Sequence, residues 1–250
     1  MKSNMERLDK LLSRQGLGSR SGVKELIRRG RVLINGLPCL DPDQKTDPQK
    51  DLVQVDGQRL SLAVLRYGML NKPPGILTAA NDRRAKTVVD LLPQSLRAMG
   101  LMPVGRLDKD ARGLLLFTTD GPLAHFLLSP RRHVAKEYLV RVNGPLGEAD
   151  VSAFENGLTL SDFTALPAKL DILETGLQES YAMVTLKEGK FHQVKRMFHA
   201  RGLTVTDLKR VSFGSLRLDE SIPEGGFREL SDSEIEALRR DAGREDSNHA

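Results

Sequence analysis

The sequence has very little cysteine and few large aromatic residues. Its 250 residues contain one cysteine, Cys39, three tyrosines and no tryptophan. A single thiol cannot form a disulfide within the chain, and it excludes metal sites built on several thiolates. No hydrophobic run approaches the roughly 18 residues of a membrane span, and MKSNMERLDK lacks the apolar segment of a secretory signal. We therefore expect a cytoplasmic protein that does not enter a membrane.

The composition is compatible with a folded hydrophobic core and with a negatively charged binding partner. Hydrophobic residues make up 39% of the chain, which suits one large domain or two smaller ones. The formal net charge is +5. A mild basic excess of this kind fits a polyanionic partner, and the distribution of the charge says more than its total.

The first 36 residues predict a compact basic unit. Residues 5–16 place leucines at helical spacing, and residues 19–30 predict a second short helix with a serine cap. Two alternating strands follow at 31–36 and 52–57, ending in the hairpin dipeptides Asn-Gly and Asp-Gly. Residues 1–36 contain three acidic residues and nine basic ones: Lys2, Arg7, Lys10, Arg14, Arg20, Lys24, Arg28, Arg29 and Arg31. This threefold excess favours a surface that contacts phosphates over an ordinary solvated helix face.

The rest of the chain predicts an α+β fold. Strand patterns at 67–72, 101–108, 113–120, 136–144, 167–174, 180–189 and 203–213 are interrupted by helix patterns at 87–93, 122–129, 147–157, 191–202 and 231–243. Several strands follow one another directly, so we expect a mainly antiparallel or mixed sheet flanked by helices rather than regular βαβ winding. The predicted domains are 1–62, including a linker rich in Pro and Asp, and 63–241. Residues 242–250 are expected to form a disordered acidic tail.

The sharpest chemical signal is VGRLDKDARGLLLFTTDG at 104–121. A strand leads to Asp108, a short turn follows, and an apolar strand returns to the core. Reactive groups often lie at such a position on a rigid scaffold. An isolated Asp near glycine is more often a turn-capping residue, so this segment alone leaves both interpretations open.

Two further segments carry suitable residue types. Tyr138 lies in KEYLVRVN, although a lone strand tyrosine usually belongs to the core. Between Lys187 and Arg217 there are eight basic residues against two acidic ones, with phenylalanine and histidine interleaved. That mixture is typical of a groove that neutralises a nucleic-acid backbone and stacks a base. An amphipathic helix with Val194 and Met197 facing inward is equally compatible with it.

Taken together, these segments resemble known families. RLDKLLSRQGLGSRSGVKELIRRGRVLINGLPC resembles the ribosomal-protein S4-type RNA-binding domain. GRLDKDARGLLLFTTDG, with MLNKPPGI, RRHVAKEYLV, EGKFHQVKRMF and LKRVSFG in order, resembles the ribosomal RNA pseudouridine synthases that carry such a domain. GKFHQVKRMFHARG and RRHVAKEYLV are most similar to the small-subunit rRNA pseudouridine synthase A (RsuA) branch. Ala111 departs from the family, whose members commonly have Thr or Ser there.

The resemblance implies a reaction and a set of roles. The enzyme would isomerise a uridine in ribosomal RNA, and the similarity to the RsuA branch favours small-subunit (16S) RNA. Asp108 would act at the ribose, with Lys195 as its cationic partner. Tyr138 would stack on the base. Arg196 is the alternative partner of Asp108. The other residues expected to contact RNA are Arg106, Lys72, His192, Gln193 and Arg196 in the catalytic domain, and Arg7, Lys10, Arg20, Lys24, Arg28, Arg29 and Arg31 in the N-terminal domain. The reaction gains and loses no atoms, so we expect no cofactor and no metal, and a monomer acting on ribosomal RNA or an assembling subunit.

Two alternatives stay open beside this interpretation, and two more are disfavoured. A large-subunit rRNA synthase of the same family would use the same chemistry. A non-catalytic rRNA-binding assembly factor would use only the N-terminal domain and would tolerate loss of Asp108. An RNA methyltransferase would need a glycine-rich nucleotide loop after a strand, and the sequence has none. A thiol enzyme is disfavoured because Cys39 lies in the N-terminal domain.

Overall fold

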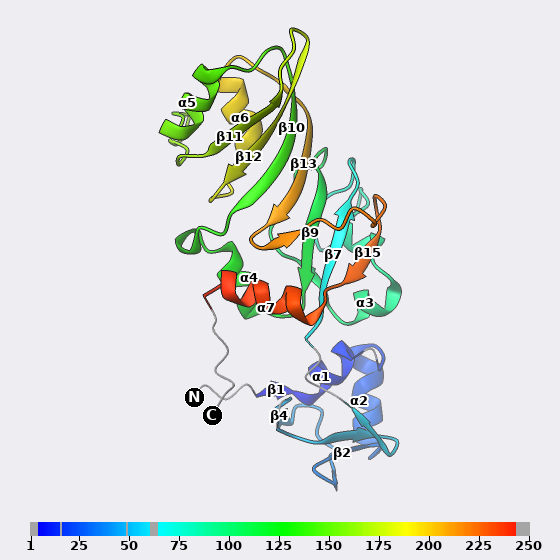
Figure 1. Cartoon of the computed structure of the whole chain (residues 1–250). Coiled ribbons are helices and arrows are strands. Elements are labelled where there is room, and N and C mark those ends of the chain that lie inside the picture. The colour runs from blue at the N-terminus through cyan, green and yellow to red at the C-terminus, as the bar shows by residue number, and fades with distance from the viewer. Residues whose placement is uncertain (1–4, 16, 49, 61–64, 244–250) are drawn as a thin grey trace. The chain divides into compact units, whose positions relative to one another are not determined.

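The chain divides into two compact units. A computed structural model describes residues 5–15, 17–48, 50–60 and 65–243. The first unit comprises residues 1–66 with 92–101, and the second comprises 67–91 with 102–250 (Figure 1). None of the described helices is long and apolar enough to cross a bilayer.

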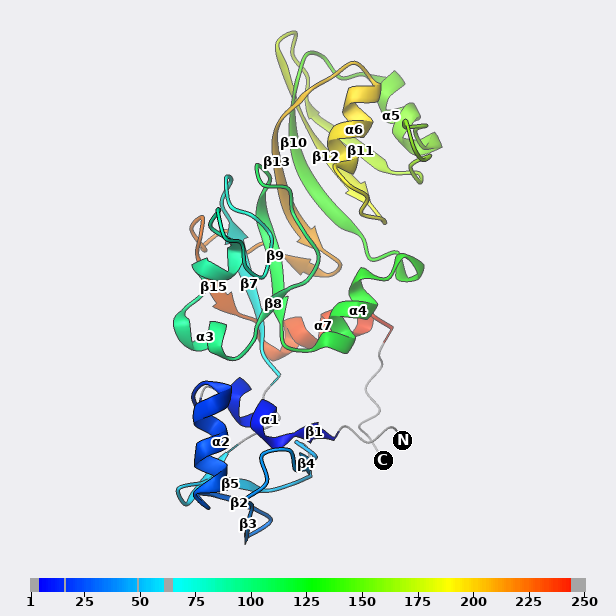
Figure 2. The same cartoon turned by 180° about the vertical axis from the view of Figure 1, so that it is seen from behind.

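The first unit packs short helices on small antiparallel sheets. Strands β2, β5, β3 and β6 form a sheet in the order β3-β2-β5-β6, and β1 pairs with β4 (Figure 2). The elements are β1 (Glu6–Arg7), α1 (Leu8–Arg14), α2 (Arg20–Arg28), β2 (Val32–Ile34), β3 (Leu37–Pro38), β4 (Lys45–Thr46), β5 (Val53–Val55), β6 (Gln58–Leu60) and α3 (Gln94–Ala98). The leucines of α1 pack against Val23 and Ile27 of α2 and the valines of β2 and β5. The helix–helix–hairpin prediction is confirmed.

Local signals in this unit act as the sequence predicts. The Ser19 side chain accepts a hydrogen bond from the Gly22 amide, which caps α2. Asn35 and Gly36, at the tip of the β2–β3 hairpin, have φ of 52° and 83°. Two successive residues with positive φ make the tight turn whose twist matches antiparallel strands.

The second unit is built on one large mixed sheet. Its strand order is β11-β12-β10-β13-β9-β7-β15, with β14 added to β13 and β8 to β9. The elements are β7 (Tyr67–Lys72), η1 (Val88–Leu91), β8 (Met102–Pro103), β9 (Arg112–Thr118), α4 (Gly121–Leu128), η2 (Pro130–Arg132), β10 (Lys136–Asn143), α5 (Glu148–Asn156), β11 (Lys169–Glu174), β12 (Glu179–Leu186), α6 (Gln193–Ala200), β13 (Val205–Phe213), β14 (Leu216–Arg217), β15 (Phe227–Glu229) and α7 (Asp232–Asp241). The pairings are antiparallel except between β13 and β9. The predicted α+β class is confirmed.

The parallel pairing of β13 with β9 depends on Gly113. Arg210 lies opposite Gly113 in the register. A Cβ atom at Gly113 would lie 2.3 Å from the Arg210 carbonyl oxygen, and Gly113 has a φ of +98°. Only glycine permits both the close approach and this backbone conformation. The pairing fixes the start of β9, and the turn that precedes it, beside β13.

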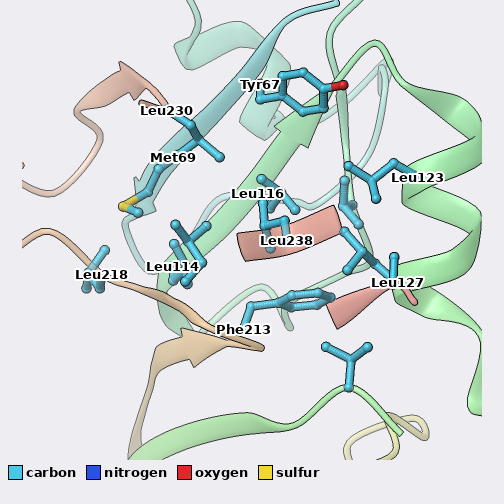
Figure 3. Packing of buried hydrophobic residues seen from close by; sticks show 14 of the residues in the cluster. Tyr67, Met69, Leu114, Leu116, Leu123, Leu127, Phe213, Leu218, Leu230 and Leu238 are labelled. Carbon is cyan, nitrogen blue, oxygen red and sulfur yellow. The ribbon is translucent and has the colours of Figure 1, made fainter. Parts of the chain in front are cut away.

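Helices cover the sheet at both ends. Helices α5 and α6 pack on β11 and β13 respectively, and the rings of Phe154 and Phe198 join them at 4.9 Å between centroids. At the other end α4 and α7 enclose a core with β7, β9 and β13. Figure 3 shows its side chains, among them Leu116, Leu127 and Phe213. Burial of these apolar surfaces holds the helices against the sheet at each end.

The structure differs from the predicted local structure in three details. Asp-Gly is a dipeptide that often forms turns between strands, but at Asp120-Gly121 the Asp120 side chain accepts from the Leu123 amide and caps α4. Residues 87–93 form only the short 3₁₀ helix η1. The three-residue strand β15 was not predicted, because it is too short to show a period. Residues 244–250 of the predicted tail lie outside the described residues.

Candidate active site

The segment 104–111 presents Asp108 on a turn between β8 and β9. The sequence predicted a strand up to Asp108, but β8 ends at Pro103. The Thr78 hydroxyl donates to the Leu107 carbonyl at 2.8 Å and accepts from the Leu107 amide at 3.2 Å. The backbone of Leu107 is therefore hydrogen-bonded to a side chain and not to a neighbouring strand. The Ala111 amide then donates to the Asp108 carbonyl and closes the turn. The Asp108 side chain keeps 23% of its surface exposed.

Lys72 lies beneath this turn. Its ammonium donates to the carbonyls of Pro73 and Lys109, both at 3.1 Å, and of Ala111 at 2.7 Å. The side chain is fully buried, and burial lowers its pKa to about 8 against the opposing effect of the nearby Asp110 and Asp108 carboxylates. The prediction that Lys72 lines the RNA cleft is wrong, because its charged end is directed at backbone carbonyls inside the protein. It fixes the shape of the turn instead.

Helix α6 brings Lys195 to the aspartate. The Lys195 Nζ atom lies 3.3 Å from Asp108 Oδ2 and 2.6 Å from Asp110 Oδ1. The hydrogen bond from Lys195 is the main cause that lowers the pKa of Asp110. His192 Nε2 lies 3.5 Å from Asp108 Oδ1. Asp108 therefore has an ammonium on one oxygen and an imidazole near the other, while Asp110 shares the ammonium.

Asp110 is a partner that the sequence prediction did not name. Its spacing of two residues from Asp108 across a tight turn was the available signal, because such a turn can direct both carboxylates to one cation.

Two other residues of α6 lie differently from their prediction. Gln193 is 4% exposed. Its side-chain amide donates to Glu188 Oε1 at 2.5 Å and accepts from the Lys190 amide at 2.9 Å. Arg196 pairs with Asp162 and lies over the ring of Phe163. Gln193 is thus an internal brace rather than an RNA contact, and Arg196 is engaged with a loop rather than with Asp108.

Tyr138 and Arg106 connect two adjoining hollows. The first, here called the target hollow, is lined by Arg106, Leu107, Asp108, Ala111, Tyr138, Leu186, Gly189, Lys190, His192, Gln193, Val194 and Leu208. The second, here called the basic hollow, has a volume of about 570 Å³, and its lining includes Lys136, Phe163, Lys187, Glu188, Arg210 and Phe213. Arg106, Tyr138, Gly189 and Lys190 line both. Tyr138 lies on β10 and is 8% exposed, whereas Arg106 is exposed.

The chemistry of the target hollow follows from these contacts. It offers a carboxylate held by a lysine, an aromatic ring on a rigid strand, and an exposed guanidinium at its rim. A carboxylate at such a position can act as a nucleophile or as a base. The described residues contain no cluster of three or more His, Cys, Asp or Glu side chains suited to a metal ion.

The predicted basic surface of the first unit is partly neutralised. Arg7, Lys10, Arg20 and Lys24 surround a hollow with Asp9, and hydrogen bonds from Arg7 hold the pKa of Asp9 below its usual range. Arg29 pairs with Glu25 on α2, and Arg31 pairs with Asp56. Arg28, like Arg20, is exposed and shows no ion pair with the residues that the structure describes. Lys2 and the Arg14 side chain lie outside the described part.

Comparisons with known proteins find similarity over both parts of the chain. A family model described as RNA pseudouridylate synthase matches residues 66–200, and a model of the S4 domain matches residues 6–52. An RNA pseudouridine synthase of Bacillus subtilis, called uncharacterized, is 42% identical over 93% of this chain and 98% of its own length.

Relatives named for both ribosomal subunits are also similar. Ribosomal small subunit pseudouridine synthase A of Yersinia pestis is 39% identical over 93% of this chain and 97% of its own length. Ribosomal large subunit pseudouridine synthase B of Vibrio vulnificus is 38% identical over 94% of this chain and 74% of its own length. A crystal structure of a pseudouridylate synthase superposes with a TM-score of 0.65 at 36% identity, covering 93% of this chain and 99% of the other.

Proposed function

The chain belongs to the RNA pseudouridylate synthase family, and we propose that it isomerises one uridine of small-subunit ribosomal RNA to pseudouridine. Activity on RNA follows from the family and from the S4 domain. The motifs GKFHQVKRMFHARG and RRHVAKEYLV support the small-subunit branch. Identities of 39% and 38% to relatives named for the two subunits do not separate them, so the choice of subunit needs the experiment below.

The observation that carries the proposed mechanism is that Asp108 lines one hollow with Tyr138 and is paired with Lys195. Lys195 lies 3.3 Å from Asp108, and Asp108 and Tyr138 both line the target hollow. These side chains come from the turn before β9, from α6 and from β10. Because three separate elements supply them, the arrangement depends on the folded sheet and not on local sequence alone.

The reaction requires a carboxylate near the sugar. The bond between ribose C1′ and base N1 breaks, the base turns, and C5 bonds to C1′. The C5 proton leaves and N1 gains a proton, so the atoms balance without an oxidant or reductant. Asp108 serves this reaction either by attacking C1′ or by removing a ribose proton. Both roles need an ionised carboxylate, which the Lys195 ammonium favours.

The remaining roles concern the base and the RNA chain. Tyr138 stacks on the target base and relays the C5 proton to water. Arg106, exposed at the rim of the hollow, occupies the space that the target nucleotide leaves when it flips out of its stack. Flipping costs on the order of a few kcal/mol, which such a contact helps to offset. His192 lines the same hollow beside Asp108 and contacts the ribose or its phosphate.

The N-terminal residues anchor the substrate. In this proposal residues 1–62 bind RNA through Arg7, Lys10, Arg20, Lys24, Arg28, Arg29 and Arg31, and residues 63–241 carry catalysis. The protein acts as a cytoplasmic monomer on free ribosomal RNA or on an assembling subunit. Positive charge gathered on a small unit supports this division, because phosphate contacts dominate nucleic-acid affinity.

The decisive experiment maps pseudouridines in both ribosomal RNAs from cells that lack the gene. The cells are complemented with the wild-type protein or with Asp108→Asn. We expect one small-subunit site to disappear and to return only with the wild type. Loss of a large-subunit site would keep the chemistry and overturn the choice of subunit. If every site persists and purified wild-type protein forms no pseudouridine in either RNA, the assembly-factor alternative replaces this proposal.

A further inference from the structure

Two buried cations line the basic hollow. Lys136 on β10 is 9% exposed and Arg210 on β13 is 2% exposed. Both line the basic hollow, and both lie over the ring of Phe213, at 5.0 and 5.4 Å from its centroid. Two positive charges therefore occupy one small region on neighbouring strands.

These cations have few partners. The Lys136 ammonium donates to the Val134 carbonyl at 2.8 Å, and Arg210 Nε donates to the Leu114 carbonyl at 2.8 Å. Arg210 Nη2 is buried and finds no hydrogen-bond partner among the residues that the structure describes. Across the same described ranges, neither side chain pairs with a carboxylate.

Such an arrangement is costly when nothing balances it. Burial, and then the charge of Arg210, lower the pKa of Lys136 to about 8. A buried charge or an unsatisfied buried donor destabilises a fold unless a counter-charge or an acceptor compensates. An anion in the basic hollow would supply both, because its oxygens accept hydrogen bonds and its charge faces the two cations.

The walls of the basic hollow favour a nucleotide over a simple anion. Lys187 and Lys190 add positive charge, while Tyr138 and Phe163 add aromatic surface. Glu188 is the acidic residue of the lining, and its Oε1 is held by Gln193 and the Leu166 amide. Cations suit a phosphate, and aromatic faces suit a base. A volume of about 570 Å³ leaves room for both parts.

The geometry points to a second nucleotide subsite: we propose that the basic hollow binds the RNA nucleotide next to the target uridine, with its phosphate against Lys136 and Arg210. This inference rests on the proposed function, since the target hollow must take the uridine. The two hollows share Arg106, Tyr138, Gly189 and Lys190. Consecutive nucleotides of one strand can therefore occupy them together, and the subsite contributes to the choice of substrate by holding the strand in register.

The test combines one charge removed from the RNA with one removed from the protein. Short RNAs around the mapped uridine carry a neutral methylphosphonate at one linkage at a time, and kcat/KM is measured for each. With the wild type we expect a loss of about 10- to 100-fold at one linkage beside the target, as for a charge-assisted hydrogen bond. With Lys136→Met we expect a similar loss on unmodified RNA and little further loss at that linkage.

The controls separate the subsite from the fold. Lys169→Met removes an exposed lysine of β11 that pairs with Asp171, and it should keep the wild-type profile. Thermal unfolding shows whether Lys136→Met folds. If it does not fold, Lys187→Met removes an exposed cation that also lines the basic hollow. This variant should show the same pattern with smaller changes: a loss on unmodified RNA and a reduced further loss at that linkage.

The contrary outcomes are distinct. If methylphosphonate losses at every linkage are equal in the wild type and in the two hollow variants, the subsite proposal is overturned while the synthase activity stands. If the wild type forms no pseudouridine in ribosomal RNA, the proposed function has failed and the subsite fails with it.

Discussion

The ammonium of Lys195 lies 3.3 Å from a carboxylate oxygen of Asp108, although helix α6 and the turn before β9 are far apart in the sequence. Both side chains keep 23% of their surface exposed. An ion pair open to water contributes little to stability. A carboxylate that must stay ionised beside a bound sugar gains more from the same ammonium, because the substrate excludes water from the hollow.

Replacing Lys195 should therefore affect catalysis more than stability. We expect Lys195→Met to lower the single-turnover rate by about 100-fold, equivalent to roughly 3 kcal/mol of transition-state stabilisation, and to change the free energy of unfolding by less than about 1 kcal/mol. Lys195→Arg keeps the charge and should recover part of the rate. Single-turnover rates and urea denaturation measure the two quantities. A Met variant that lost stability but kept its rate would show that the pair is structural.

Asp110 provides a matched comparison on the same turn. It lies closer to Lys195, at 2.6 Å, but its side chain is 73% exposed. Asp110→Asn removes the competing charge and leaves Lys195 to Asp108 alone. We expect its kcat/KM to stay within about fivefold of the wild type, less than the 1.4 kcal/mol of a tenfold change, whereas Asp108→Asn should abolish turnover. Comparable losses in both variants would mean that Asp110 takes part in the reaction.

The sequence predicts some features of the site and of the fold, but not others. The residue types at Asp108, Tyr138 and Lys195 belong to ordered motifs, so the sequence could predict that Asp108 lies near the other two, as the shared hollow and the ion pair show. The burial of Lys72 and Gln193 could not, because a long polar side chain looks the same in sequence whether it faces water or backbone carbonyls. Strands β7 and β10 were predicted from the sequence, and the side chains of β10 alternate between buried and partly exposed along the strand. Strand β15 gains its identity only by pairing with β7.

Lys72, which lies beneath the turn that carries Asp108, should make the stability of the fold depend on pH. Its pKa is about 8 in the folded protein against 10.5 for an exposed lysine. Between these values the unfolded chain binds a proton that the folded protein does not, so stability from this group rises with pH. Lys72→Met lacks the effect. We expect the wild type to be the more stable protein, since the variant leaves three carbonyls without their donor.

The measurement is the free energy of unfolding of the wild type and of Lys72→Met from pH 7 to pH 10. The difference should grow with pH above about 8, by an amount on the order of 1 kcal/mol or more. Lys169→Met, which changes an exposed lysine, serves as the control and should give no such growth. A constant difference would show that Lys72 keeps its proton throughout, and that burial does not govern its titration.

The last prediction concerns the basic face of α2. Arg20, Lys24 and Arg28 follow one another at a spacing of four residues, which places them on one side of the helix. Arg20 and Arg28 are exposed and carry no ion pair to the described chain, so both are available to phosphates. Arg31, by contrast, is paired with Asp56. Removing one side chain that binds a phosphate should reduce the slope of log affinity against log salt by about 1.

We therefore expect the double variant Arg20→Ala, Arg28→Ala to bind ribosomal RNA fragments more weakly and to lower the salt slope by about 2. Arg31→Ala should lower it less, because its charge is already balanced within the protein. Titrations at several salt concentrations measure both, and thermal unfolding checks that α2 stays folded. Since Val23 and Ile27, and not the exposed Arg20 and Arg28, pack α2 into the core, the double variant should unfold at nearly the wild-type temperature. An unchanged slope would move the RNA-binding surface of this unit away from α2.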